Sequence, residues 1–240
     1  MKIAILGYGK MGKEIEKIAV SRKHTIGLII DINNAQDFTI ENLRSCDTAI
    51  DFSIPASAYQ NIMTCFEAGI PIVSGTTGWL ERYDDVTVQC NQLNGSFFYA
   101  SNYSLGVNIF FSINKKLAEI MNRFTDYDVS MEEIHHTQKL DAPSGTAITL
   151  ANDIIKLVDR KSTWKLKEDI NSPDILSIEA KRIENIPGTH IVNYDSPVDY
   201  IEIKHAAKSR QGFALGAVLA AEFLFNKKGI FGMKDLLGFE

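Results

Sequence analysis

The chain has 240 residues, of which 45% are hydrophobic, so it can bury the core of one large or two small domains. Its 25 basic and 30 acidic residues give a net charge of −5 without a basic stripe, which argues against a nucleic-acid partner. Three scattered cysteines, Cys46, Cys65 and Cys90, do not fit a disulfide framework and suit the reducing cytoplasm, where we expect the protein to be located.

No segment predicts insertion into a membrane. Met1-Lys2 is followed by only four apolar residues before Gly7, too few for a signal peptide. The longest apolar stretch, 213–225, is shorter than the roughly 20 residues that span a bilayer. We therefore expect no membrane partner and predict a buried helix over 213–225.

The N-terminal segment has the pattern of a dinucleotide-binding unit. Residues 2–6 are a short apolar run that predicts a buried strand, and G-x-G-x-x-G follows at 7–12. A helix pattern covers 13–20, and a second apolar run, 25–30, ends in Asp31. An acidic residue near this spacing binds the cofactor ribose in such units. The alternative interpretation is a glycine-rich turn without a ligand.

The alternation of strands and helices continues along the first half. Apolar runs at 48–52, 71–74 and 96–100 predict strands, and 56–68 predicts a helix. This alternation is typical of a parallel sheet, in which ligands bind at the carboxyl ends of the strands. Small and polar residues follow three of these strands, at Ser53, 75–77 and 102–104, and we expect them to line a cofactor site.

The segment 133–147 concentrates residues that can move protons and bind anions. It holds His135 and His136, and histidine is a residue type that can move a proton near neutral pH, while Lys139 carries a compact positive charge. Pro143-Ser144-Gly145-Thr146 predicts the start of a helix, whose free N–H groups and hydroxyls can bind a carboxylate or phosphate. Together these features indicate a site that holds a small acid and protonates it.

Two other interpretations of this segment remain open. The histidines could be structural, and Ser-Gly-Thr could be a helix cap with a turn glycine. A metal site is disfavoured, because adjacent residues on an extended segment point to opposite faces and His135 and His136 cannot easily share an ion. The cysteines have no ligand spacing either, so we predict no metal.

The second half has a different pattern. Residues 175–180, 190–194 and 200–205 alternate in polarity, which predicts a half-exposed antiparallel or mixed sheet. The polar stretch 159–174 is expected to contain a surface loop.

With these motifs the chain resembles the dihydrodipicolinate reductase (4-hydroxy-tetrahydrodipicolinate reductase) family. The run 135–147, His-His-Thr-Gln-Lys-Leu-Asp-Ala-Pro-Ser-Gly-Thr-Ala, is similar to that family's signature. Further similar segments follow in order along nearly the whole chain, at 51–53, 75–78, 100–108, 188–190 and 205–210.

The resemblance implies an α/β fold with two domains. A Rossmann-like nucleotide-binding domain would comprise 1–103 plus 213–240, and an α+β substrate-binding and tetramerisation domain with a mixed sheet would comprise 104–212. The implied activity is the NAD(P)H-dependent reduction that gives tetrahydrodipicolinate in the diaminopimelate route to lysine. The cofactor would be NADH and/or NADPH, the substrate a small cyclic dicarboxylate, and the assembly a homotetramer.

The resemblance also implies roles for single residues. His135 is similar to the acid–base histidine and Lys139 to the catalytic lysine. The implied substrate-binding residues are His136, Lys139, Ser144, Gly145 and Thr146. The implied cofactor-binding residues are Gly7, Gly9, Lys10, Met11, Gly12, Asp31, Phe52, Ser53, Gly75, Thr76, Thr77, Ser101, Asn102, Tyr103, Arg210 and Phe213.

Two departures from the family pattern concern the cofactor. The glycine loop is one residue shorter than the form Gly-x-Gly-Gly-Arg-Met-Gly, and Ile32 and Asn33 follow Asp31 where some members carry an arginine. A carboxylate at Asp31 repels a 2′-phosphate, whereas Lys10 could attract it. We therefore expect the protein to use both nucleotides and to prefer NADH.

Two rival functions share part of this pattern. Another two-domain nicotinamide enzyme, such as an amino-acid or semialdehyde dehydrogenase, would keep the nucleotide half but does not predict His-His-x-x-Lys followed by Ser-Gly-Thr. A non-catalytic nucleotide sensor would keep the glycine motif and Asp31 but would not need Lys139.

Overall fold

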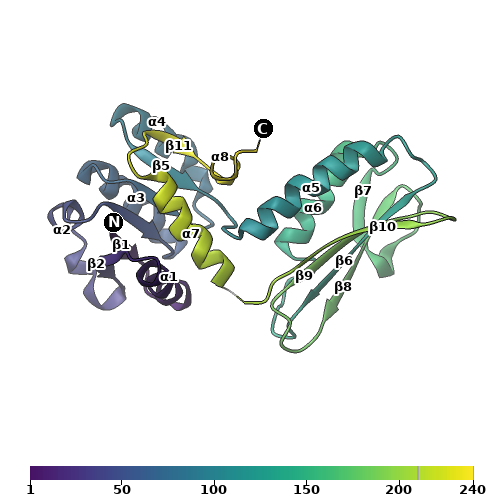
Figure 1. Ribbon diagram of the computed structural model, residues 1–240, viewed down its shortest axis with the longest axis horizontal. Helices are drawn as coiled ribbons and strands as arrows, with labels where there is room; N and C mark the ends of the chain where they lie inside the picture. The colour runs from purple at the N-terminus through teal and green to yellow at the C-terminus, as the bar shows by residue number, and fades with distance from the viewer. Residues whose placement is uncertain (210, 240) are drawn as a thin grey trace. The chain divides into compact units, whose positions relative to one another are not determined.

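The computed structural model describes residues 1–209 and 211–239 (Figure 1). The chain divides into two compact units, Met1–Leu105 with Gln211–Glu240, and Gly106–Arg210. Within the described residues, no helix is both long enough and apolar enough to cross a membrane. The nucleotide-binding and substrate-binding roles given above to the two parts of the chain stay predictions.

The first unit contains a six-stranded sheet in the order β11-β5-β4-β3-β1-β2, in which every neighbouring pair is parallel. The strands are β1 (Lys2–Leu6), β2 (Thr25–Ile30), β3 (Thr48–Asp51), β4 (Ile72–Ser74), β5 (Ser96–Tyr99) and β11 (Gly229–Phe231). The chain direction across the sheet reverses between β1 and β3, since β2 lies on one side of β1 and β3 on the other. Ligands of doubly wound sheets bind at the carboxyl ends beside such a reversal. The glycine loop follows β1 and Ser53 follows β3, so both lie at this position.

Helices cover both faces of the first sheet, because strand residues alternate between two hydrophobic clusters. Ile3 and Ile5 of β1 belong to one cluster, and Ala4 and Leu6 belong to the other. The first cluster includes residues of α1 (Lys10–Ser21), α7 (Gln211–Leu224) and α8 (Met233–Leu237). The second includes residues of α2 (Ile40–Arg44), α3 (Pro55–Ala68) and α4 (Tyr83–Gln92). The buried helix expected over 213–225 is confirmed as α7, which packs against α1 (Figure 1).

The second unit contains a mixed sheet of five strands in the order β10-β9-β6-β8-β7. They are β6 (Asp128–His135), β7 (Thr163–Leu166), β8 (Ile175–Arg182), β9 (Thr189–Asp195) and β10 (Tyr200–Ala206). β8 runs parallel to both β6 and β7, whereas β9 runs antiparallel to β6 and β10. Helices α5 (Leu105–Met121) and α6 (Gly145–Leu157) lie on one face of this sheet, where they share a hydrophobic cluster with it (Figure 1). The mixed sheet and the α/β class are therefore confirmed.

The polar stretch 159–174 holds more regular structure than its sequence predicts. It contains β7 and a 3₁₀ turn, Lys167–Asp169, beside its irregular segments. β7 pairs only with β8, at the edge of the sheet, and its residues are half-buried or exposed. An edge strand of this kind needs no apolar run, which explains why hydrophobic patterning missed it.

Substitution of Gly216 should test the packing of α7 in the first unit. A Cβ atom at Gly216 would lie 1.7 Å from the carbonyl oxygen of Tyr103, so Gly216→Ala requires the backbone to move. We expect a loss of about 2 kcal/mol or more in the free energy of unfolding, measured by urea denaturation.

Gly212→Ala on the same helix is the matched control. Its nearest neighbour would be Ser104 Oγ at 3.8 Å, an ordinary contact. Alanine also favours helix over glycine by up to about 1 kcal/mol, so this variant should be as stable as the wild type or slightly more stable. Equal stability of the two variants would contradict the close approach of α7 to Tyr103.

Candidate active site

The glycine motif forms the turn from β1 into α1, and its three glycines serve different purposes. Gly7 has φ +92°, and a Cβ there would lie 2.4 Å from the carbonyl oxygen of Phe52. A Cβ at Gly12 would lie 2.2 Å from the carbonyl oxygen of Gly7. By contrast, nothing lies within 4 Å of a Cβ at Gly9, which is the N-cap of α1. The packing requires Gly7 and Gly12, whereas Gly9 borders open space.

Open space before a helix start suits an anion. Lys10, Met11 and Gly12 form the first turn of α1, whose backbone N–H groups have no partner within the helix. Lys10 is exposed, and Met11 packs against the first hydrophobic cluster. This turn fits a pyrophosphate group, which the positive end of a helix binds.

Asp31 follows β2 and caps the 3₁₀ turn Ile32–Asp37. Its Oδ1 accepts a hydrogen bond from Ile32 N at 2.7 Å, and its own N–H donates to Asn34 Oδ1 at 2.7 Å. The capping role was not foreseen from the sequence, and it fixes the direction of the carboxylate at the end of β2.

A buried carboxylate, Asp51, organises the loops after β3 and β4. It accepts hydrogen bonds from four neutral donors, the side chains of Ser53, Asn61, Ser74 and Thr76, at 2.6 to 3.0 Å. Thr76 Oγ1 also accepts from Ser53 N at 2.9 Å, so this hydroxyl donates one hydrogen bond and accepts another inside the protein. Burial raises the pKa of Asp51, while the four hydrogen bonds act in the opposite direction. Asp51 was not among the residues assigned to the site from the sequence.

Aromatic packing occupies two more of the expected cofactor residues. The Tyr103 side chain is buried, its hydroxyl donates to Ser74 O at 2.7 Å, and its ring packs 5.5 Å from that of Phe52. A Cβ at Gly75 would lie 2.3 Å from the Phe52 ring. Gly75 is therefore required by this ring, and the Tyr103 hydroxyl is committed to the protein interior.

The remaining expected cofactor residues have varied environments. Thr77 and Ser101 are exposed, Asn102 Oδ1 accepts from Ser104 N at 2.9 Å, and Phe213 is half-buried on α7. Arg210 lies outside the described residues. Their roles toward a nucleotide stay predictions.

In the second unit, β6 presents His135 beside a buried carboxylate, Glu133. The two residues are two positions apart on one strand, so their side chains share the face covered by the helices. His135 Nδ1 lies 3.3 Å from Glu133 Oε2, an ion-pair distance without hydrogen-bond alignment. Arg182 of β8 donates from Nη2 to Glu133 Oε1 at 3.0 Å. The sequence analysis assigned no role to Glu133 or Arg182. The two-residue repeat of a strand does place Glu133 on the same face as His135.

The start of α6 is held by the same carboxylate. Ser144 is the N-cap of α6, its N–H donates to Glu133 Oε2 at 3.0 Å, and its Oγ accepts from Ala147 N at 3.2 Å. Ser144 Oγ also lies 3.0 Å from His190 Nε2 of β9. The Ser144 side chain thus points inward, whereas nothing lies within 4 Å of a Cβ at Gly145. The open part of the predicted anion site is therefore at Gly145 and the half-buried Thr146.

Lys139 lies in the loop between β6 and α6 and is paired with a neighbour. Its Nζ donates to both carboxylate oxygens of Asp141 at 2.8 Å, and this contact lowers the pKa of Asp141. Arg182 Nη2 also donates to the carbonyl oxygen of Asp141 at 2.6 Å, which ties the loop to Glu133. His136 begins the loop, and its Nδ1 is buried without a hydrogen-bond partner among the residues described.

The charges of this cluster are set by its buried members. Burial by itself raises the pKa of Glu133, but contacts with His135, Ser144 and Arg182 outweigh that effect and hold the pKa at about 2. Burial, with the adjacent His135, lowers the pKa of His190 to about 4. At neutral pH Glu133 is therefore an anion and His190 is neutral.

The polar atoms of Glu133, His135 and His190 lie within 4.8 Å of one another. Such spacing can suit a cation, but the Arg182 guanidinium already provides the positive charge next to Glu133. The geometry therefore needs no metal ion, and the expectation of none stays a prediction.

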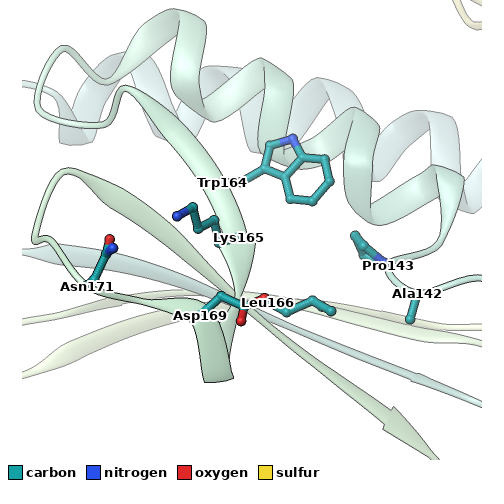
Figure 2. A pocket seen from close by; sticks show the side chains of 7 residues that line it. All are labelled: Ala142, Pro143, Trp164, Lys165, Leu166, Asp169 and Asn171. Carbon is teal, nitrogen blue, oxygen red and sulfur yellow. The ribbon is translucent and has the colours of Figure 1, made fainter.

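A cavity of about 560 Å³ lies next to the loop that ends at Ser144 (Figure 2). Its lining residues are Ala142, Pro143, Trp164, Lys165, Leu166, Asp169 and Asn171. None of the residues expected to bind substrate or cofactor lines it, so we place the candidate site at the start of α6.

Comparison with known proteins gives a consistent result over the whole chain. Residues 1–103 match the family model described as dihydrodipicolinate reductase, N-terminus, and residues 106–237 match dihydrodipicolinate reductase, C-terminus. The chain is 54% identical over 241 residues to 4-hydroxy-tetrahydrodipicolinate reductase of Christiangramia forsetii, covering 99% of this chain and 98% of the relative. It is 35% identical to the protein of that name from Methanosarcina acetivorans, covering 98% and 89%.

Solved structures show the same fold. Dipicolinate-bound dihydrodipicolinate reductase from Paenisporosarcina sp. TG-14 has a TM-score of 0.78 at 21% identity, with 98% of each chain covered. A probable dehydrogenase from Thermotoga maritima has a TM-score of 0.54 at 9% identity, covering 98% of this chain and 92% of that one.

The buried His190 should make stability depend on pH. Its folded pKa of about 4 lies below the ordinary 6.5, so between these values the unfolded chain binds a proton that the folded chain does not. Stability should therefore fall as the pH falls, by about 2 kcal/mol between pH 7 and 5 from this residue.

Urea denaturation of the wild type and of His190→Gln at both pH values measures this contribution. Glutamine can still hydrogen-bond Ser144 Oγ but does not titrate. The wild type should lose about 2 kcal/mol more than the variant on acidification. Parallel losses in the two proteins would show that His190 can be protonated in the folded state.

Proposed function

The chain belongs to the dihydrodipicolinate reductase family, and from this premise we propose which of its residues bind the cofactor, bind the substrate and move the proton. The activity is the NAD(P)H-dependent reduction that gives tetrahydrodipicolinate in the diaminopimelate route to lysine. The observation that carries the residue assignment is the cluster around Glu133, which brings His135, the start of α6 and the loop of Lys139 together.

The substrate is a cyclic dicarboxylate, so two anionic groups must be bound while the ring stays accessible. The open start of α6 at Gly145 and Thr146 supplies N–H groups for one carboxylate, and the helix dipole favours its charge. Lys139 and His136 lie on the loop that leads to this helix and supply further donors. Ser144 acts mainly by capping α6, since its hydroxyl is bound to Ala147 and His190.

Reduction also requires a proton, and His135 is the proposed donor. Hydride addition to the conjugated C=C–C=N system places negative charge on the far carbon or nitrogen, where an acid must deliver the proton. His135 is well held for this task, because its ring lies 5.1 Å from that of His190 and beside the buried carboxylate of Glu133. Orientation of this kind supplies much of the rate in such reactions.

The nucleotide residues of the first unit fit a pyridine dinucleotide. The open space at Gly9 and the first turn of α1 would hold the pyrophosphate, and Asp31 would accept hydrogen bonds from the ribose. Bound NAD(P)H supplies the hydride. Phe52, Gly75 and Tyr103 then act by shaping the loops at the ends of β3, β4 and β5, since their own contacts are internal.

We also propose a homotetramer located in the cytoplasm. The second sheet ends in β10, and near it Val198 is 86% and Tyr200 67% exposed, which leaves apolar area for another copy to cover. The three cysteines are free thiols, as in a reducing compartment. Light scattering with size-exclusion chromatography would reveal a tetramer, and a monomer at micromolar concentration would contradict the proposal.

The activity itself is tested by NADH oxidation with the freshly generated condensation product of aspartate semialdehyde and pyruvate. We expect turnover only when this product is present. Oxidation at the same rate with either precursor alone would point to one of the rival dehydrogenase functions.

His135→Gln should lower kcat roughly 10²- to 10⁴-fold and change KM much less, because a proton donor acts in the transition state. Steady-state kinetics at saturating NADH measure both values. A variant within threefold of the wild type would mean that the proton comes from another group or from water.

Lys139→Ala should also reduce turnover strongly while leaving nucleotide affinity nearly intact, because Lys139 belongs to the second unit and the glycine motif to the first. Calorimetric titration with NADH gives the nucleotide affinity. His136→Gln is the comparison variant and should act mainly on KM. Unchanged turnover of Lys139→Ala at saturating substrate would refute the assignment.

The cofactor preference should follow the charges near the ribose. Asp31 repels a 2′-phosphate and Lys10 attracts it, so we propose that both nucleotides are used and that NADH has the higher kcat/KM. Lys10→Ala should weaken NADPH binding selectively, because only NADPH carries the additional phosphate. The measurement is kcat/KM for NADH and for NADPH at the same low ionic strength. A clear NADPH preference would contradict the proposal.

A further inference from the structure

We propose that Glu133 is a positioning residue, whose buried carboxylate stabilises the protonated form of His135 and fixes the start of α6 beside it. The inference rests on the proposed role of His135 as proton donor. It goes further because it assigns the charge balance of the site to an ion pair, Glu133 with Arg182, that does not need to touch the substrate.

The geometry gives the two oxygens of Glu133 separate tasks. Oε2 accepts the backbone N–H of Ser144 at 3.0 Å and lies 3.3 Å from His135 Nδ1. Oε1 accepts from Arg182 Nη2 at 3.0 Å. The side chain of Glu133 is 0% exposed, so water cannot replace any of these partners. A buried carboxylate held in this way has a fixed direction.

The sheet register holds this arrangement in place. His135 of β6 is paired with Arg182 of β8, and Glu133 is paired with His190 of β9. Strands on both sides therefore set the distance between the carboxylate and the imidazole. A Cβ at Gly188 would lie 3.1 Å from His135 Nε2, so the absence of a side chain there leaves room for the other ring nitrogen.

The balance of charge explains why Glu133 is needed. The groups that face it are His135, His190, Arg182 and the Ser144 N–H, and His190 is neutral at pH 7. In the nearby loop Lys139 and Asp141 neutralise each other. With Glu133 present, Arg182 is compensated and His135 has a carboxylate next to it. Without Glu133, a proton on His135 would face the positive charge of Arg182 unopposed.

Two variants with opposite expected effects test this proposal. Glu133→Gln keeps an oxygen that can accept the Ser144 N–H but removes the negative charge. Because the donor must be protonated, kcat should fall as the pH rises, and this falling limb of the kcat–pH profile reports the proton donor. In Glu133→Gln the limb should move to lower pH by roughly one unit, so that kcat measured at a pH above the limb falls about tenfold. Arg182→Gln removes the positive charge, and the same limb should move to higher pH.

Glu132→Gln is the matched control. Glu132 is adjacent on β6 but on the other face, where it pairs with Lys181 at 2.6 Å. It removes one carboxylate from the same strand and should leave the profile unchanged. NADH affinity, measured by calorimetry, should stay within twofold in all three variants, because the glycine motif belongs to the other unit.

The outcomes separate this inference from the proposed function. Shifts in opposite directions support it, whereas an unmoved limb, or equal shifts in the same direction, would reduce Glu133 to a structural residue. If Glu133→Gln fails to fold, the half-exposed Arg182 still gives the test, since an unmoved limb in Arg182→Gln overturns the proposal. If His135→Gln is fully active, the proposed function fails first. If His135→Gln is impaired and neither charge variant shifts the profile, only this inference fails.

Discussion

A charge that is buried must be matched by polar groups of the protein, and Glu133 imposes this requirement on the second unit. Its partners come from β6, the start of α6 and β8, with His190 of β9 at 3.8 Å. A slip of one residue in the register of β6 would turn Glu133 and His135 to the opposite face and leave Arg182 without its carboxylate. The charge therefore selects one strand register and one helix start, and both are features on which the proposed substrate site depends.

The first unit also contains a buried carboxylate, but polar groups of a different kind stabilise it. Asp51 is also fully buried, but its four partners are neutral side chains, and burial accordingly raises its pKa, whereas that of Glu133 is lowered to about 2. The four donors come from the ends of β3 and β4 and from α3, so the carboxylate ties together the loops that follow these strands. The Thr76 hydroxyl is thus explained by its hydrogen bonds to Asp51 and Ser53 within the protein. Polar residues at the ends of strands can serve the fold before they serve a ligand.

The sequence predicts those features that depend on neighbours along the chain. The glycine motif, the alternating strands and the helix start at Ser144 all follow from local periodicity or capping, and the structure confirms them. Glu133, Arg182 and His190 become neighbours only through the pairing of β6 with β8 and β9, which a single sequence does not specify. The capping role of Asp31 is local, since its partners are Ile32 and Asn34, and it was missed because Asp31 was assigned only to the ribose. The buried hydroxyl of Tyr103, which donates to Ser74 O, belongs with Glu133, Arg182 and His190. The residue types were visible, but their partners depend on tertiary structure.

The two ion pairs around the candidate site differ in how easily they can be exchanged. In the pair of Lys139 and Asp141 the Asp141 side chain is 60% accessible, and a pair whose carboxylate is open to solvent contributes little stability. In the proposed substrate-binding role of Lys139, a substrate carboxylate would therefore replace Asp141 at a small cost in free energy. The pair of Glu133 and Arg182 is different, because the Glu133 side chain is fully buried and removal of Arg182 would leave its charge without compensation. Arg182 links the two pairs through the carbonyl oxygen of Asp141, so the loop can change its carboxylate partner while the backbone behind it stays anchored.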